Sequence, residues 1–194
     1  MRRLILAAAL FLLAACAQPP VPDDHFYRLA VNDPAPGAQT LKGALEVQRF
    51  SADGVTAARP IAFSKPEAPG EFQAYHYHFW TEPPTVLLQN KLVEYLRAAR
   101  LAASVVTPEL RIAPQFVLTG RIKRFERILA APPRVMAEIE LGLKEERTDR
   151  LIHLATYRAE EQSSGKTVAH AALALGRATA RIYGRFLADV RGKR

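Results

Sequence analysis

The sequence has little of what disulfide-stabilised proteins and several common enzyme classes need. Its 194 residues include one cysteine, Cys16, so no disulfide can form within the chain and a hydrophobic core must stabilise the fold. The chain has no Gly-rich phosphate loop, no G-x-S-x-G elbow and no H-E-x-x-H motif. Nucleotide binding, serine hydrolysis and zinc proteolysis therefore have no motif to support them.

The N-terminus has the pattern of an export signal. Two arginines precede the apolar run LILAAALFLLAA at residues 4–15, which is too short to cross a bilayer. Leu13-Ala14-Ala15-Cys16 then fits the bacterial lipobox, in which the cysteine is diacylated and becomes the mature N-terminus. We predict a signal peptide at residues 1–15 and lipidation of Cys16, against the alternatives of an uncleaved anchor or ordinary secretion. Ala17, where aspartate would signal retention, favours the outer membrane.

The segment after Cys16 predicts a tether. Residues 17–24 read AQPPVPDD, and prolines and acids with so few apolar residues cannot form a packed core. We therefore divide the mature chain into a lipidated tether, 16–24, and one domain, 25–194. The net charge of +8 falls to +6 without Arg2 and Arg3. This charge suits an anionic membrane, an acidic protein partner or a plain solvated surface better than nucleic acid, which an exported protein seldom meets.

Most of the domain has the pattern of β-strands. Alternation of apolar and polar residues is clearest from residue 115 onward, where three segments joined by short turns predict an antiparallel meander. Shorter strands are predicted before that point. The full set of predicted strands is 25–30, 45–50, 59–64, 72–80, 104–106, 115–128, 134–146 and 151–162.

Two segments change to the helical period. Residues 84–100 place leucines on one face, and Pro84 stands at the first helical position, where its missing N–H costs nothing. Residues 167–190 carry a second apolar face, with Ala169, Ala172, Gly176 and Ala180 adding a small-residue surface that permits close packing. The order of elements predicts an α+β fold, a mostly antiparallel sheet with two helices packed on one face.

The strand 72–80 contains the closest pair of histidines. His76 and His78 are two residues apart and would project from the same face of a strand, as metal ligands often do. A zinc site needs a third ligand, and Glu82 lies past the end of the strand. We therefore predict no metal and no cofactor, and a small metal-dependent enzyme using this pair stays as the weaker alternative.

The paired carboxylates Glu138 and Glu140 also share a strand face. Catalysis by two carboxylates requires a pocket and a second reactive group, and nothing nearby in the sequence suggests either. Arg121, Lys123 and Arg127 are predicted to share a face of their own strand and to pair with such acids across the sheet. The simplest interpretation is a solvated, ion-paired surface.

Several of these segments together resemble the family of ABC-type transport auxiliary lipoproteins. The resemblance rests on the lipobox with Cys16, on Phe26-Tyr27-Arg28-Leu29, on Tyr77 and Trp80-Thr81-Glu82-Pro83-Pro84, on Leu87-Leu88 and Leu92, and on Leu118–Glu126, which is similar to L-x-G-x-L-x-x-F-E. It covers nearly the whole mature chain. Two departures are Val86-Leu87, where the family has methionine-leucine, and Arg100-Leu101-Ala102, where a Ser-Gly-like helix end is usual.

The resemblance implies a protein without catalytic activity. It would be an outer-membrane lipoprotein facing the periplasm, beside an inner-membrane ABC permease and ATPase and a partner of the mammalian-cell-entry (MCE) type. Together these are expected to move lipids between the membranes and maintain the envelope, and the lipoprotein would serve as the docking component. The resemblance also implies that some members assemble as homo-oligomeric rings. A lipoprotein of another envelope assembly machine is the alternative.

Four residues at the junction of the strand 72–80 and the following helix are the candidate partner-binding residues. They are Tyr75, Tyr77, Trp80 and Glu82. Large amphipathic aromatics are enriched at protein interfaces. The competing interpretation is that these aromatics belong to the core and rim of the sheet, with Trp80 packing over the start of the helix.

Overall fold

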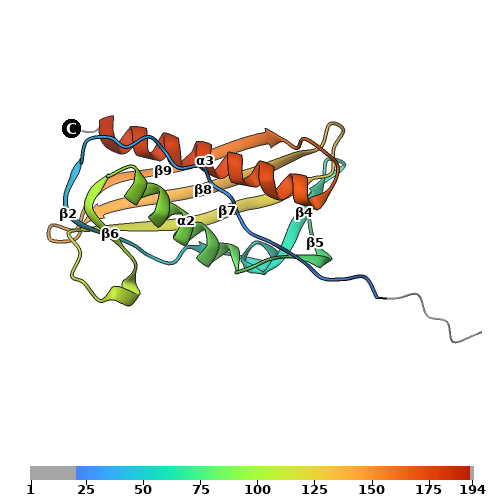
Figure 1. The fold of residues 1–194 in the computed structure, drawn as a ribbon, viewed down its shortest axis with the longest axis horizontal. Helices are drawn as coiled ribbons and strands as arrows, with labels where there is room; N and C mark the ends of the chain where they lie inside the picture. The colour runs from blue at the N-terminus through green and yellow to red at the C-terminus, as the bar shows by residue number, and fades with distance from the viewer. Residues whose placement is uncertain (1–20, 193–194) are drawn as a thin grey trace, which may run out of the picture.

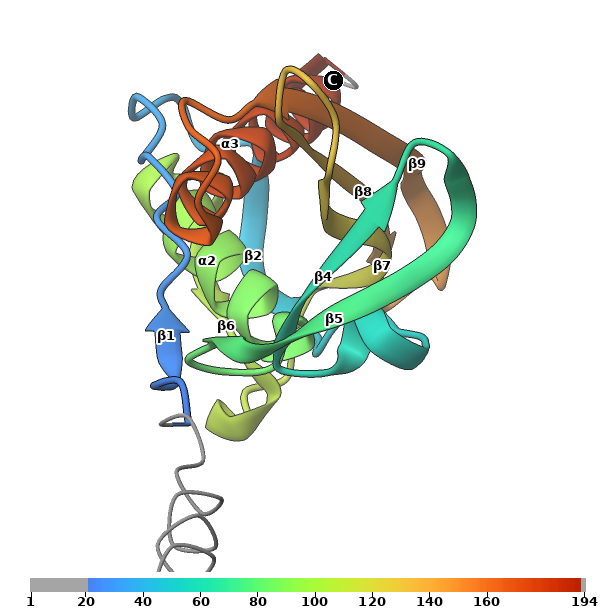
Figure 2. The ribbon, with the colours of Figure 1, turned by 90° about the vertical axis from the view of Figure 1, so that its right-hand side faces the viewer.

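The computed structural model describes residues 21–192 and forms one α+β domain, as predicted. Nine strands of the described residues make one sheet, and both long helices lie on the same side of it (Figures 1 and 2). In chain order the elements are β1 (His25–Tyr27), β2 (Leu41–Val47), β3 (Ser51–Ala52), η2 (Gly54–Ala57), β4 (Pro60–Lys65), β5 (Ala68–Trp80), α2 (Pro84–Ala98), β6 (Ala102–Val106), η3 (Pro108–Leu110), β7 (Phe116–Ile128), β8 (Arg134–Glu145), β9 (Arg150–Gln162) and α3 (Val168–Gly192).

The predicted meander of β7, β8 and β9 is confirmed. β8 pairs antiparallel with β7 on one side and with β9 on the other, over nearly its whole length. The apolar residues that alternate along β8 are all fully buried: Val135, Ala137, Ile139, Leu141 and Leu143. This arrangement follows from the period of two, because one buried face fixes the register of a strand.

The other edge of β7 pairs with three separate strands in succession. β2 lies beside Phe116–Leu118, β3 beside Arg121 and Ile122, and β4 beside Glu126–Ile128, each parallel to β7. β6 then extends the sheet from β2, and β5 and β1 extend it from β4. The longest pairings are antiparallel, as predicted, while these short parallel pairings make the sheet mixed. The β4–β5 turn is also tighter than predicted, since β5 begins at Ala68.

Helix α3 packs along the inner face of β8 and β9. Its small-residue surface has a definite contact, because a Cβ at Gly176 would overlap the carbonyl oxygen of Ala30. The chain between β1 and β2 therefore crosses α3 at close range, and Leu29 in this segment is only 1% exposed. In Figure 1 this blue segment runs between α2 and α3 towards β2. The predicted close approach is thus to an extended segment of the N-terminal region.

Helix α2 begins at Pro84, as predicted, and ends at Ala98, two residues before the predicted end. Pro84 occupies its first turn, and Tyr183 on α3 donates a hydrogen bond to the Leu88 carbonyl at 2.8 Å, which fixes the two helices together. Beyond the helix, Arg100 adopts a left-handed backbone with φ of 55°. Glycine usually occupies this position after a helix, because a Cβ is strained there.

Different elements lie at the two ends of the long axis of the molecule. Residues 21–24 lead into β1 at one end of the long axis of the domain, where β5 pairs with β1 (Figure 1). β6, the loop before β2 and the C-terminal end of α3 lie at the opposite end. The described chain therefore enters the domain at the end remote from β6.

Candidate functional site

The predicted partner-binding strand β5 is joined to the N-terminal strand β1 by a cluster of rings. The parallel pairing places His25 beside His78 and Phe26 beside Phe79. The two imidazoles stack with ring centroids 5.0 Å apart, and the two phenyl rings stack at 5.6 Å. Only three residues of β1 pair with β5, so these ring contacts provide much of the attachment of the N-terminal strand.

His78 has polar and charged neighbours from several elements. Its Nδ1 lies 2.8 Å from the hydroxyl of Tyr27, and the ring of Tyr75 meets it edge-on. Burial lowers the pKa of His78, and the nearby charges of His25 and Arg127 lower it further. The structure therefore favours neutral His78, whose Nδ1 can accept a hydrogen bond from the Tyr27 hydroxyl.

Of the predicted partner-binding residues, the two tyrosines lie in different environments. Tyr75 is half-buried, packs on Phe63 and accepts a hydrogen bond from Arg127 Nη1 at 2.7 Å. Tyr77 is 37% exposed, and its ring is near that of His76. Tyr77 thus presents its ring to solvent, whereas the Tyr75 hydroxyl is already engaged within the domain.

Trp80 belongs to the core, and its side chain does not form part of the surface. It is 1% exposed and packs against Phe125 of β7, with ring centroids 5.4 Å apart. Its backbone is also fixed, since its N–H donates to the Arg59 carbonyl at 2.8 Å. This agrees with the interpretation that Trp80 supports the strand-to-helix junction, because an indole so fully packed has no face left for a partner.

Glu82 is exposed and lines a small groove. The groove has a volume of about 190 Å³ and lies between the N-terminal segment and the start of α2. Arg28, Asn90, Lys91 and Glu94 also line it. Its mixture of charges suits a polar contact with another protein better than an apolar ligand.

The five histidines of the chain do not gather into one site. His153 is buried beside Tyr157, whose hydroxyl donates to Asp189 Oδ2 at 2.6 Å. His170 contacts Thr167 in the turn before α3, and its backbone N–H donates to the Thr167 hydroxyl. Within residues 21–192, no group of three or more His, Cys, Asp or Glu side chains is placed to hold a metal ion.

The paired carboxylates lie on the helix-free face of the sheet. Glu140 accepts hydrogen bonds from Lys123 at 2.9 Å and from Thr156 at 3.3 Å, and the Lys123 hydrogen bond is the main cause that lowers the Glu140 pKa. Glu138 lies opposite Arg124 and Arg158 in the strand register. The predicted cross-strand ion pairing is confirmed for Lys123.

The prediction for Arg127 is wrong. A β-bulge between Ile122 and Arg124 shifts the alternation of β7, so that Arg127 lies on the opposite face from Arg121 and Lys123. It donates to Tyr75, as above, and to the backbone carbonyl of Lys166 just before α3. Arg121 pairs with Asp53 at 2.7 Å in place of a partner on β8.

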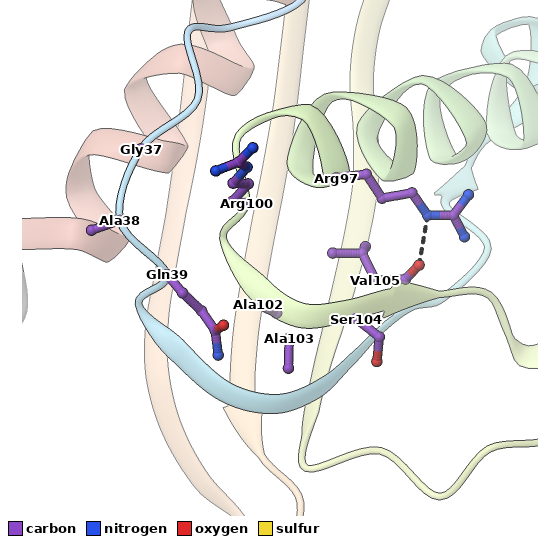
Figure 3. A pocket seen from close by; sticks show the side chains of 9 residues that line it. All are labelled: Gly37, Ala38, Gln39, Arg97, Arg100, Ala102, Ala103, Ser104 and Val105. Carbon is purple, nitrogen blue, oxygen red and sulfur yellow. Dashed lines mark hydrogen bonds between the residues drawn. The ribbon is translucent and has the colours of Figure 1, made fainter.

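Sequence reasoning missed a hollow at the end of the molecule remote from β1. It has a volume of about 550 Å³ and lies between the loop before β2, the end of α2 and the strand β6 (Figure 3). The residues that line it are Gly37, Ala38, Gln39, Arg97, Arg100, Ala102, Ala103, Ser104 and Val105. Arg97 Nε donates to the Val105 carbonyl at 2.8 Å. The sequence does show Arg100 where the family usually has a Ser-Gly-like helix end. It does not show that residues 37–39 face Arg100, because the two segments are far apart in the chain.

Comparison with known families agrees with this fold. A sequence model described as the ABC-type transport auxiliary lipoprotein component matches residues 27–185, so the chain belongs to this family of lipoproteins that accompany ABC transporters. No curated protein matched the sequence. No helix among the described residues has the length and apolar character of a membrane span.

Solved structures share the architecture at low sequence identity. Protein XCC0632 from Xanthomonas campestris is 22% identical, with a TM-score of 0.74 over 87% of this chain and 95% of its own. An uncharacterized protein is 13% identical, with a TM-score of 0.66 over 89% and 99%. The hypothetical protein CT253 from Chlamydia trachomatis is 13% identical, with a TM-score of 0.51 over 78% and 97%. These similarities show the fold alone.

Proposed function

We propose that this chain is an outer-membrane lipoprotein that serves as a non-catalytic docking component of an ABC transporter. Its partners would be an MCE-type protein and the inner-membrane permease and ATPase, in a system that moves lipids between the membranes and maintains the envelope. The observation that carries the proposal is the family match over residues 27–185. The proposal goes further than the match, which is to an ABC-transport auxiliary lipoprotein without a stated partner or cargo.

Docking suits the chemistry of the described side chains better than catalysis does. The groups that could act as acid or base are engaged in contacts within the fold: His78 with Tyr27, and Glu140 with Lys123. Neither lies in a deep pocket with a second reactive group, as acid–base catalysis requires. We infer a protein that presents surfaces to partners.

The proposed membrane attachment depends on the N-terminal region. Residues 1–15 would be removed as a signal peptide, Cys16 would carry the acyl chains, and residues 16–24 would be the tether. Cys16 lies outside the described residues, whereas Val21–Asp24 are exposed and form neither helix nor strand. Substituting Cys16 by serine should release the protein from membranes, and incorporation of labelled palmitate tests the lipidation directly. Ala17 supports the outer-membrane assignment, which fractionation of the two membranes would test.

The proposed contact surface lies at the start of α2 and along the end of β5. Tyr77 and Glu82 provide exposed polar and aromatic groups, Tyr75 forms the half-buried margin, and Trp80 supports the surface from the core. Phe26, which is 55% exposed, adds an apolar group beside them on β1. An aromatic centre with a polar rim is typical of protein interfaces.

We also propose that the domain assembles as a homo-oligomeric ring. The support is the pairing of the sheet, because the edge strand β9 pairs only with β8 among the described residues. Edge strands with free peptide groups are ready to pair with another chain. Light scattering on the purified lipoprotein gives the oligomeric state, and a strict monomer would contradict this part of the proposal.

Co-purification from cells that express all components tests the proposed function. The wild-type lipoprotein should retain the MCE-type protein, and the double variant Tyr75→Ser with Tyr77→Ser should lose it while keeping its circular dichroism spectrum and melting temperature. If the variant loses the fold itself, the tyrosines belong to the framework of the sheet. If wild type retains a different envelope assembly instead, the proposed partner is wrong.

A further inference from the structure

We propose that the hollow beside β6 binds an acidic, extended segment of a partner protein. The segment would add as a strand to the open edge of β6, and Arg97 and Arg100 would bind its carboxylates. This inference rests on the proposed docking function and deepens it, because it assigns a second contact surface and the chemistry of what binds there.

The edge of β6 is available for pairing. β6 pairs with β2 alone among the described residues. The Val105 carbonyl accepts a hydrogen bond from Arg97 and so points away from β2. Since the N–H and carbonyl of one residue in an extended strand point to the same side, Val105 also presents its N–H to the open edge. Ala103 and Ser104 are both exposed, so an added strand would meet no covering segment there.

The hollow is positively charged. Two of the nine residues that line it are arginines and none is acidic. Neither Arg97 nor Arg100 forms an ion pair with a carboxylate of the described residues, although Arg97 has the backbone contact to Val105. Guanidinium groups bind carboxylates in bidentate fashion. Charge complementarity therefore selects aspartate or glutamate on the incoming segment.

Arg100 provides an independent indication. Its φ of 55° lies in the left-handed region, where a residue with a Cβ is strained and glycine is not. The end of α2 does not need the Arg100 side chain, because the Ala99 carbonyl accepts from Gly37 N at 3.2 Å and from Arg191 Nη2 at 2.7 Å. The Arg100 backbone closes the helix, since its N–H donates to the Arg97 carbonyl at 3.0 Å, but no hydrogen bond or ion pair of the described residues engages its guanidinium, which is available in the hollow.

The place of the hollow in the fold suits such a contact. It lies at the end of the long axis opposite to the entry of the N-terminal trace (Figure 1). A domain tethered through residues 16–24 can therefore present β6 away from the membrane surface. An acidic segment from a neighbouring protein can reach it without passing the tether.

Because the Arg100 backbone is strained, substituting Arg100 by glycine tests the inference in the full-length protein. Arg100→Gly removes the charge and relieves the left-handed residue, so it should not weaken the fold. Arg111→Gly is the matched control, since Arg111 also has a left-handed backbone, with φ of 53°, and is exposed outside the hollow. Both variants lose one positive charge and gain one glycine, so only the position differs.

The probes are a short blocked peptide of alternating glutamate and threonine, its glutamine-for-glutamate copy, and inorganic phosphate. The glutamate peptide should bind wild type and Arg111→Gly equally and bind Arg100→Gly about tenfold more weakly, as the loss of one charge-assisted contact predicts. The glutamine copy should bind more weakly to wild type. Bound glutamate peptide should slow hydrogen exchange of the Val105 amide, which reports strand addition.

Five results would overturn the inference. The first four are no binding of the glutamate peptide, equal loss in the two variants, equal binding of the glutamine copy, and binding without protection of the Val105 amide. The fifth is phosphate that binds as tightly as the peptide, which would mark a simple anion site. Peptide binding can fail while the MCE-type protein still co-purifies with wild type, in which case docking stands and uses another surface. Loss of co-purification with intact peptide binding would instead contradict the proposed partner.

Discussion

Polar groups at one end of this domain are bonded to one another, whereas those at the other end have fewer partners within the domain. At the end where the N-terminal strand enters, His25, Tyr27 and His78 contact one another, and Arg127 is bonded to Tyr75. At the other end, the arginines beside β6 have no carboxylate partner among the described residues, and a strand edge is open. The difference indicates that these rings at the entry end hold β1 on the domain beside the exposed Tyr77, whereas the arginines at the remote end remain available to another molecule.

The largest expected effect concerns the core beneath the entry end. Trp80→Ala should reduce the free energy of unfolding by about 3–5 kcal/mol, because it removes a fully buried indole that packs on Phe125. Urea unfolding followed by circular dichroism measures this. Tyr77→Ala on the same strand should cost less than about 1 kcal/mol, since its ring is exposed. Equal losses in the two variants would contradict the division into core and surface.

A smaller effect is expected where the chain passes between the two ends. Gly176→Ala should destabilise the fold by about 1–3 kcal/mol, because the added Cβ overlaps the Ala30 carbonyl and the crossing segment must move. Gly192→Ala near the end of the same helix meets no atom within 4 Å and is the control. Chemical unfolding of the two variants compares them, and an unchanged Gly176→Ala would show that the N-terminal segment is not held there.

The hydrogen bond of Tyr27 tests the attachment of β1 itself. Tyr27→Phe should cost about 0.5–1.5 kcal/mol, since it removes the hydroxyl that bonds to His78 and keeps the ring. Proteolysis near residues 21–24 should become faster as β1 detaches more often. Tyr77→Phe removes an exposed hydroxyl and should change neither measurement. Unchanged cleavage in Tyr27→Phe would mean that the hydrogen bond does not hold β1.

At the remote end, relief of backbone strain should raise stability. Arg100→Gly should gain up to about 1 kcal/mol, because glycine adopts the left-handed conformation without a Cβ clash. Thermal unfolding measures the gain, with Arg111→Gly as the comparison. A marked loss of stability in Arg100→Gly would show that the guanidinium supports the fold, and would remove the strain argument for a binding role.

The smallest expected effect is a dependence of the stability of the fold on pH, caused by His78 at the entry end. Because the His78 pKa is lowered from its ordinary value of 6.5, the folded chain binds fewer protons than the unfolded chain just below that pH. Stability should therefore be complete above pH 6.5 and fall as the pH drops through the folded pKa. Urea midpoints at pH 7 and pH 5 should differ more in wild type than in His78→Gln. An equal difference would exclude His78 as the cause.

The long strands and both helices could be predicted because each has one buried face. The alternation of β8 and the helical spacing of α3 are local patterns, and burial of that face fixes how each element packs. Trp80 was assigned both to the core and to the partner surface, because an aromatic at a strand end fits either pattern.

The remaining features depend on contacts between distant segments. The parallel pairing of β2, β3 and β4 with β7 leaves little signal in such short strands. The bulge in β7 turned Arg127 to the other face, which no alternation count reveals. The hollow combines residues 37–39 with residues 97–105, and the pairing of His25 with His78 joins segments equally far apart.

The central claim, a docking domain with contact surfaces at its two ends, is tested most directly by photo-crosslinking in cells. A photoreactive amino acid would replace Tyr77, Ala103 or Thr156, the last lying on the helix-free face as a control. The account predicts adducts with the MCE-type protein from positions 77 and 103 and none from 156. Adducts from 156 alone, or from none of the three positions while the partner is present, would contradict it.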